Sequence, residues 1–149
     1  MPLGCATSPS GRAPVTGRTD EVAGADRDVA AIDDDPVFLA LVRRRLRGSG
    51  LSLATFASSA DALEALRGSC ARLVLVDLHI GGESGLELLA TLRAERRLDG
   101  ARACVVTASV PEEAVVAEVG RLGAEIVLKE DALAEGALIG LLRGPPAGS

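Results

Sequence analysis

Apolar residues along the chain follow two alternating patterns. Five short runs are almost continuously apolar, which is typical of strands buried in a parallel sheet; they lie at 28–33, 51–56, 71–77, 102–108 and 124–129. After each run, apolar residues recur every three or four positions, which predicts amphipathic helices; these segments lie at 36–48, 58–68, 84–98, 110–123 and 131–144.

The boundaries of the first predicted helix carry their own signals. Asp35 is a favourable N-cap residue, Pro36 suits the first helical position, and Gly48 suits the exit from the helix. The alternation of strand and helix predicts an α/β fold, with a parallel sheet that helices cover on both faces. Ligands of such sheets bind at the carboxyl ends of the strands.

The two ends of the chain lack this periodicity. Residues 1–27 are rich in Gly, Pro, Ser, Thr and Ala and are predicted to be a disordered tail, and residues 144–149 form a second short tail. The folded unit is therefore predicted to be one domain over residues 28–143.

Composition and charge disfavour several classes of protein. The formal net charge of −5 argues against a nucleic-acid-binding surface. No apolar stretch approaches the roughly 18 residues of a membrane span, and the first segment lacks the apolar core of a secretory signal. The three cysteines, Cys5, Cys70 and Cys104, are an odd number without close spacing, which indicates reduced thiols. These features predict a cytoplasmic protein that binds neither nucleic acid nor membrane.

Polar residues stand at the ends of four of the predicted strands. Asp33 and Asp34 end the first strand, Asp77 ends the third, Thr107 ends the fourth and Lys129 ends the fifth. Each also has a purely structural interpretation: the aspartates as a helix cap, Asp77 as a turn former, Thr107 as an ordinary strand-end residue and Lys129 as a surface charge. Their arrival at one edge of the sheet favours a functional site.

The order and spacing of these residues resemble the receiver domain of two-component response regulators, the CheY-like family. Thr107 lies thirty residues after Asp77 (107 − 77), Lys129 lies twenty-two after Thr107 (129 − 107), and Gly85 lies eight after Asp77 (85 − 77). The resemblance covers about 28–143 and implies a flavodoxin-like (βα)5 fold with strand order 2-1-3-4-5. It also implies a bacterial protein of phosphorelay signal transduction.

The resemblance assigns the phosphoryl chemistry to three residues. Asp77 would be the nucleophile that accepts a phosphoryl group as an acyl phosphate. Lys129 would pair with the phosphoryl oxygens, and Thr107 would donate a hydrogen bond to one of them.

The resemblance also implies a Mg²⁺ site. Asp34 and Asp77 would bind the ion through their carboxylates, the backbone carbonyl of His79 would add a third ligand, and Asp33 would hold a metal-bound water. The His79 side chain is expected to be exposed beside the site.

The sequence departs from the family pattern at three positions. Glu130 follows Lys129 where the family usually has proline, and Ile126 stands where the family has an aromatic residue that swings inward on phosphorylation. Gly81 replaces a proline in the turn after Asp77, which predicts a looser turn. The phosphorylation residues are all present, whereas the readout of phosphorylation is expected to be altered.

The leading functional hypothesis is a stand-alone receiver that a sensor histidine kinase or a histidine phosphotransfer protein phosphorylates on Asp77. Because one helix and a short tail follow Lys129, we expect no effector domain, and we expect no turnover of an external substrate. One alternative is an atypical receiver that binds partners without phosphorylation. A further alternative is a metal-dependent phosphatase with an aspartyl-phosphate intermediate.

The predicted output surface is the face formed by residues 110–143, which would bind a downstream protein or a second copy of the chain. The last predicted helix carries few charges, and its apolar residues spread around more than one stripe. Gly136 and Gly140, four residues apart, would lie on one helical face and allow a close approach. The alternative is an alanine-rich helix that is simply well buried.

Overall fold

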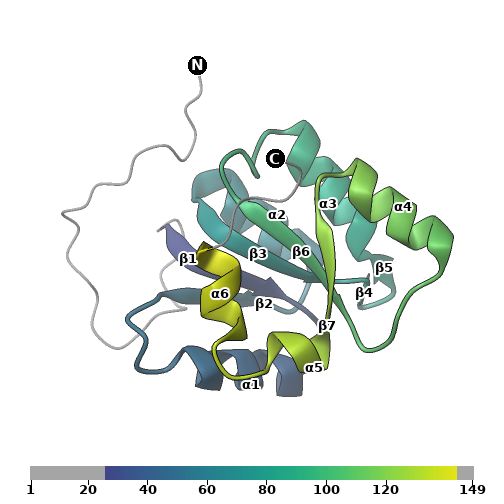
Figure 1. The fold of residues 1–149 in the computed structure, drawn as a ribbon. Coiled ribbons are helices and arrows are strands. Elements are labelled where there is room, and N and C mark those ends of the chain that lie inside the picture. The colour runs from purple at the N-terminus through teal and green to yellow at the C-terminus, as the bar shows by residue number, and fades with distance from the viewer. Residues whose placement is uncertain (1–25, 144–149) are drawn as a thin grey trace.

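The computed structural model describes residues 26–143 and places a five-stranded parallel sheet between two layers of helices (Figure 1). The strands are β1 (Arg27–Ile32), β2 (Leu53–Phe56), β3 (Ala71–Asp77), β6 (Arg102–Thr107) and β7 (Glu125–Leu128). Their order across the sheet is β2-β1-β3-β6-β7, which is the order 2-1-3-4-5 when the short hairpin strands are left out. The predicted flavodoxin-like fold and strand order are confirmed.

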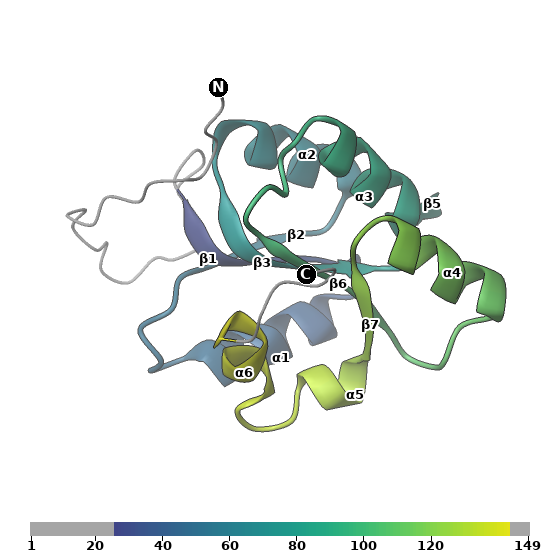
Figure 2. The same cartoon turned by 45° about the horizontal axis from the view of Figure 1, so that its top comes forward.

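Helices cover both faces of the sheet, as Figure 2 shows from a second angle. One layer contains α2 (Ser59–Gly68), α3 (Gly85–Ala94) and α4 (Glu113–Arg121). The other contains α1 (Pro36–Leu46), α5 (Lys129–Ala132) and α6 (Ala137–Arg143). A small antiparallel hairpin, β4 (His79–Ile80) and β5 (Glu83–Ser84), follows the central strand β3.

The two core clusters explain why the strands are apolar throughout. In β3, Val74 and Val76 pack into the cluster under α2, α3 and α4, whereas Leu73 and Leu75 pack into the cluster under α1, α5 and α6. Because side chains alternate between the two faces of a strand, both faces of β3 must be apolar. Polar residues are left for the strand ends.

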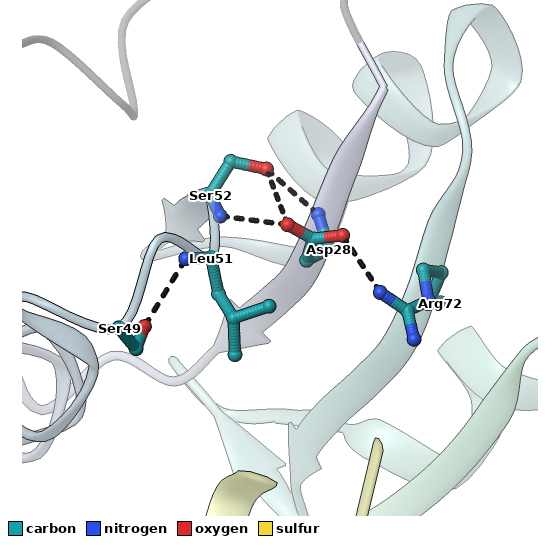
Figure 3. A network of polar contacts seen from close by, with 5 residues as sticks. All are labelled: Asp28, Ser49, Leu51, Ser52 and Arg72. Carbon is teal, nitrogen blue, oxygen red and sulfur yellow. Dashed lines mark hydrogen bonds and ion pairs between the residues drawn. The ribbon is translucent and has the colours of Figure 1, made fainter. Parts of the chain in front are cut away.

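The amino ends of the strands are tied together on the opposite edge of the sheet (Figure 3). The Asp28 carboxylate of β1 accepts a hydrogen bond from the Ser52 backbone N–H at 2.9 Å and pairs with the Arg72 guanidinium of β3 at 3.0 Å. The Ser52 hydroxyl in turn accepts from the Asp28 backbone N–H at 2.9 Å. These contacts join β1 to its two neighbours at the amino ends of the strands, opposite the carboxyl ends where the candidate site residues lie.

The last predicted helix is not continuous, so that prediction is wrong. The segment 131–144 was expected to be one helix, but α5 ends at Ala132 and α6 begins at Ala137. Gly136 between them has φ +80°, a left-handed conformation that favours glycine and ends a helix. Gly136 and Gly140 therefore do not share a helical face.

The predictions for the flanks and the thiols have mixed outcomes. The predicted tails lie outside the described residues except for Asp26 and Arg27, and Arg27 already belongs to β1. Cys104 is a buried free thiol, whereas Cys70 is half-buried and disulfide-bonded, which contradicts the prediction of a reduced thiol at that position. Within residues 26–143 no helix has the length and apolar character that a membrane crossing requires.

The N-cap of α1 provides a test of the fold. The Asp35 carboxylate accepts a hydrogen bond from the Val37 backbone N–H at 3.0 Å, so Asp35→Ala should lower the free energy of unfolding. The expected loss is about 1 kcal/mol, measured by urea denaturation. Asp35→Asn keeps an acceptor at the cap and is the matched control. If both variants lose the same free energy of unfolding, the hydrogen bond at the cap does not account for the loss.

Candidate functional site

The parallel strands bring the predicted residues to one edge of the sheet. Asp33 follows β1 directly and Asp77 is the last residue of β3, its neighbour in the sheet. Thr107 is the last residue of β6, and Lys129 directly follows β7. Because the carboxyl ends of parallel strands lie at the same edge, residues far apart in sequence become neighbours.

Asp33 is the most deeply buried of the charged groups at this edge. Its side chain has no exposed surface, and its Oδ1 atom accepts a hydrogen bond from the Asp35 backbone N–H at 2.9 Å. Its Oδ2 atom lies 2.7 Å from the Lys129 ammonium nitrogen. A buried carboxylate of this kind requires a cation beside it.

Lys129 supplies that cation. Its Nζ atom is 2.7 Å from Asp33 Oδ2 and 3.8 Å from Asp77 Oδ1, and it lies 4.8 Å from the centre of the Phe38 ring. Burial lowers the pKa of Lys129, but the hydrogen bond and the charge of Asp33, together with Asp77, outweigh burial and raise this pKa above its usual value. Lys129 is therefore a firmly charged ammonium group facing two carboxylates and an aromatic face.

The three aspartates of the predicted metal site do come together. Asp33, Asp34 and Asp77 each offer a carboxylate oxygen, and these oxygens all lie within 4.8 Å of one another. Oxygen donors that carry a high negative charge are the ligands that Mg²⁺ and Ca²⁺ prefer. The buried Asp33 Oδ2, which pairs with the Lys129 ammonium, would add an acceptor for a metal-bound water. These residues fit a hard divalent cation.

Burial and the neighbouring charge perturb the acidity of Asp77. Burial comes first and the charge of Asp33 second; together with a hydrogen bond to Asp33, they raise the pKa of Asp77 to about 6. Lys129 and the Leu78 backbone N–H act in the opposite direction, and they do not compensate fully. Without a further cation, Asp77 therefore holds a proton more readily than an ordinary aspartic acid does.

The segment after Asp77 is an ordered hairpin, so the prediction of a looser turn is wrong. Ile80 pairs with Glu83 across a two-residue turn, and Gly81 and Gly82 have φ of +60° and +87°. Two successive positive φ angles are the requirement of the tightest hairpin turns. Proline, whose φ is held near about −65°, cannot occupy the place of Gly81 in this turn.

Gly85 is required by a close approach to the backbone of Asp77. A Cβ atom at this position would lie 1.9 Å from the carbonyl oxygen of Asp77, which no side chain can do. The Gly85 N–H donates to the Leu78 carbonyl at 2.7 Å, so the chain returns to the phosphoacceptor candidate as α3 begins.

Within the described residues, Thr107 and His79 form no hydrogen bond or ion pair with the carboxylates of the site. The Thr107 hydroxyl is buried and donates to the Ser109 carbonyl at 3.0 Å. His79 begins β4, and its side chain is exposed, as expected. Of the departures, Ile126 is half-buried against the core under α2, α3 and α4, and Glu130 is an exposed residue in the first turn of α5.

Two contributors to the site were not anticipated from the sequence. Phe38 of α1 is buried in the core under α1, α5 and α6, and its ring also lies beneath the Lys129 ammonium. The Gly81 backbone N–H donates to Asp34 Oδ2 at 2.9 Å. One indication of the Gly81–Asp34 contact was present in the sequence. Glycine stands where the family has proline, and proline has no backbone N–H to donate.

Comparison with known proteins gives a consistent result. The response regulator receiver domain matches residues 29–135. The acid tolerance regulatory protein ActR of Sinorhizobium medicae is 28% identical over 134 residues, which cover 89% of this chain and 68% of that protein. The DNA-binding response regulator MtrA of Mycolicibacterium smegmatis is 34% identical over 67 residues, 45% of this chain and 29% of that protein. The chain thus spans about two thirds of the first relative and less than a third of the second.

Solved structures agree with this result. A response regulator from Burkholderia pseudomallei, with a phosphorylated aspartic acid, a calcium ion and citrate, has a TM-score of 0.63 and 28% identity over 77% of this chain and 71% of that one. The receiver domain of NarL from Mycobacterium tuberculosis has a TM-score of 0.66 and 25% identity over 81% and 99%. CheY4 of Vibrio cholerae, with a TM-score of 0.69 and 19% identity over 79% and 97%, supports the fold alone.

The raised pKa of Asp77 makes a prediction about metal-free protein. A pKa that is higher in the folded state than its ordinary value of 3.8 stabilises the fold below about pH 4, and this stability is lost as the pH rises through about 6. The free energy of unfolding of wild type minus that of Asp77→Asn should therefore fall between pH 4 and pH 7. Urea denaturation in the presence of a chelator measures it; a difference that stays constant across this range contradicts the raised pKa.

Proposed function

The chain belongs to the response regulator receiver domain family, and on that premise we propose that Asp77 accepts a phosphoryl group from a histidine kinase or a histidine phosphotransfer protein. The observation that carries the proposal is the meeting of three carboxylates within 4.8 Å beside the Lys129 ammonium at the strand ends. Phosphoryl transfer to a carboxylate needs a positioned nucleophile and compensation of negative charge, and this edge contains groups for both.

We propose Mg²⁺ as the cofactor, held by Asp34, Asp77 and the backbone carbonyl of His79, with Asp33 bound through water. The ion would offset the charge of the carboxylates and of the incoming phosphoryl group. The positive charge of the ion would also weaken the ion pair between Asp33 and Lys129. The Lys129 ammonium, which lies 3.8 Å from Asp77 Oδ1, would then pair with phosphoryl oxygens. The Thr107 hydroxyl, which donates a hydrogen bond to the Ser109 carbonyl, would donate to one of those oxygens instead.

The phosphodonor would approach over the start of α1. Val37 and Leu41 are one turn apart on this helix and are 63% and 38% exposed, although both are apolar. Val37 lies two residues after the N-cap Asp35, next to the acidic end of β1. Exposed apolar residues that border a reactive edge favour a protein partner over a small substrate.

The output would use the segment 110–143, as predicted, but not its last helix. Leu138 is buried, and Ile139, Leu141 and Leu142 are half-buried, so α6 presents no exposed large apolar side chain. Val110 and Val116, 77% and 45% exposed, place the apolar surface before and on α4. The partner there would be a downstream protein or a second copy of the chain.

A second candidate function is binding of partners without phosphorylation. Ile126 offers no aromatic ring to swing inward, and the interrupted α5–α6 segment departs from the continuous helix expected. A metal-dependent phosphatase is the less favoured alternative, and we propose that the chain turns over no external substrate. We also propose a cytoplasmic location, although the disulfide at Cys70 removes the argument from reduced thiols.

The phosphoacceptor prediction is tested by incubating the protein with Mg²⁺ and acetyl phosphate and measuring its intact mass. Wild type should gain one acid-labile phosphoryl group, and a chelator should prevent the gain. Asp77→Asn should stay unlabelled because it lacks the nucleophile. An unmodified wild type would favour phosphorylation-independent binding, and equal labelling of Asp77→Asn would identify another acceptor.

The output surface is tested with two single charges. Val116→Asp should abolish the association of the phosphorylated protein with itself or its partner, because a charge cannot be buried unpaired in an apolar contact. Val37→Asp, on α1, is the matched control: phosphorylated with acetyl phosphate, it should associate like wild type, although it should impair phosphotransfer from a kinase. Light scattering and cross-linking measure association; a protein that stays monomeric with and without phosphate, and is indifferent to Val116→Asp in pull-downs, has no interface at this surface.

A further inference from the structure

The hairpin after Asp77 makes a direct contact with the acidic pair at the end of β1. The Gly81 N–H, at the tip of the hairpin, donates to Asp34 Oδ2 at 2.9 Å. Asp34 is exposed, so its carboxylate would otherwise rotate freely in water. A hydrogen bond to a charged acceptor is among the stronger single contacts, and it selects one orientation of the carboxylate.

The hairpin is well suited to act as a rigid support. Its Ile80 side chain is 1% exposed and packs into the core under α2, α3 and α4. At its base, the Gly85 N–H donates to the Leu78 carbonyl at 2.7 Å, and Gly85 lies against the Asp77 backbone. The tip that holds Asp34 is thus part of a closed loop that starts and ends at Asp77.

We propose that Gly81 is a positioning residue for the metal site: its N–H fixes the Asp34 carboxylate relative to Asp77 before the cation binds. The inference deepens the proposed function and rests on its metal site. A carboxylate has about four lone-pair sites, so Asp34 accepts this hydrogen bond and still has lone pairs for a cation. Preorganised ligands bind more tightly because less conformational freedom is lost on binding.

The departure from the family pattern at Gly81 then has a physical meaning. A proline at this position has no N–H to donate and does not adopt a φ near +60°. Glycine supplies both the N–H and the left-handed conformation that turns the N–H toward Asp34. The glycine turn thus orients the Asp34 carboxylate through a hydrogen bond that a proline turn cannot form.

The test separates the N–H from the shape of the turn. In semisynthetic full-length protein, Gly81 is replaced either by D-alanine, which favours positive φ and keeps the N–H, or by D-proline, which favours positive φ and lacks it. Calorimetric titration then measures the affinity for Mg²⁺ alone. D-alanine should leave the affinity close to that of wild type, and D-proline should weaken it roughly tenfold, the effect of losing one hydrogen bond to a charged group. Asp35→Ala, which removes only the helix cap, should leave the affinity unchanged.

The outcomes distinguish this inference from the proposed function. Equal or tighter Mg²⁺ binding by the D-proline protein overturns the positioning role and leaves the proposed function intact. Failure of wild type itself to bind Mg²⁺ overturns the metal site and this inference together, whereas the acetyl phosphate assay still tests Asp77.

A second measurement covers the case in which the D-proline protein does not fold. Hydrogen exchange of the Gly81 amide in wild type should be slow with and without Mg²⁺, and it should become fast in Asp34→Ala. The Gly82 amide is the internal reference. Exchange at Gly81 that accelerates when Mg²⁺ binds means that the N–H is released, and this also overturns the positioning role.

Discussion

The buried ion pair between Asp33 and Lys129 is the constraint on which the strand-end edge depends. Asp33 has no exposed surface, so its charge requires a cation, and Lys129 reaches it from β7, which β3 and β6 separate from β1 in the sheet. Removing one partner of such a pair is costly because the other charge is left buried. The same two groups are those that phosphoryl transfer would use. The fold therefore keeps these two charges in place through a contact that the proposed phosphoryl transfer would rearrange.

The surroundings of Lys129 make this rearrangement feasible. Its ammonium lies over the face of Phe38, which stabilises the charge without binding it in a fixed direction. Asp77 Oδ1, at 3.8 Å, is close enough to attract the ammonium but too far for a direct hydrogen bond to it. A cation at the carboxylates would lower the negative potential at Asp33 and so weaken its hold on Lys129. Metal binding at the proposed site would thus be linked to the availability of Lys129.

Much of the fold could be predicted because its signals are local. The apolar run of β3 and the cap at Asp35 each follow from a few adjacent residues, and the spacing of Asp77, Thr107 and Lys129 follows from the length of each strand–helix unit. What could not be predicted depends on contacts across the sequence. The Gly81 N–H points to Asp34, forty-seven residues earlier, and no periodicity encodes that contact. The interruption at Gly136 was also missed, since a glycine costs a helix only about 1 kcal/mol and tertiary packing decides whether the helix continues.

The interruption between α5 and α6 determines which elements Lys129 is connected to. Lys129 is itself the first residue of α5, and α5 is anchored by Ala132, which is buried, and by the Arg45 guanidinium of α1, which donates to the Leu133 carbonyl. The same short helix also contacts α6, which follows the segment around Gly136. Ile126, packed against the core on the side of α4, has no ring to move into a new site. Lys129 is therefore connected through α5 and the Arg45 contact to α1, the helix that begins at the acidic cluster itself.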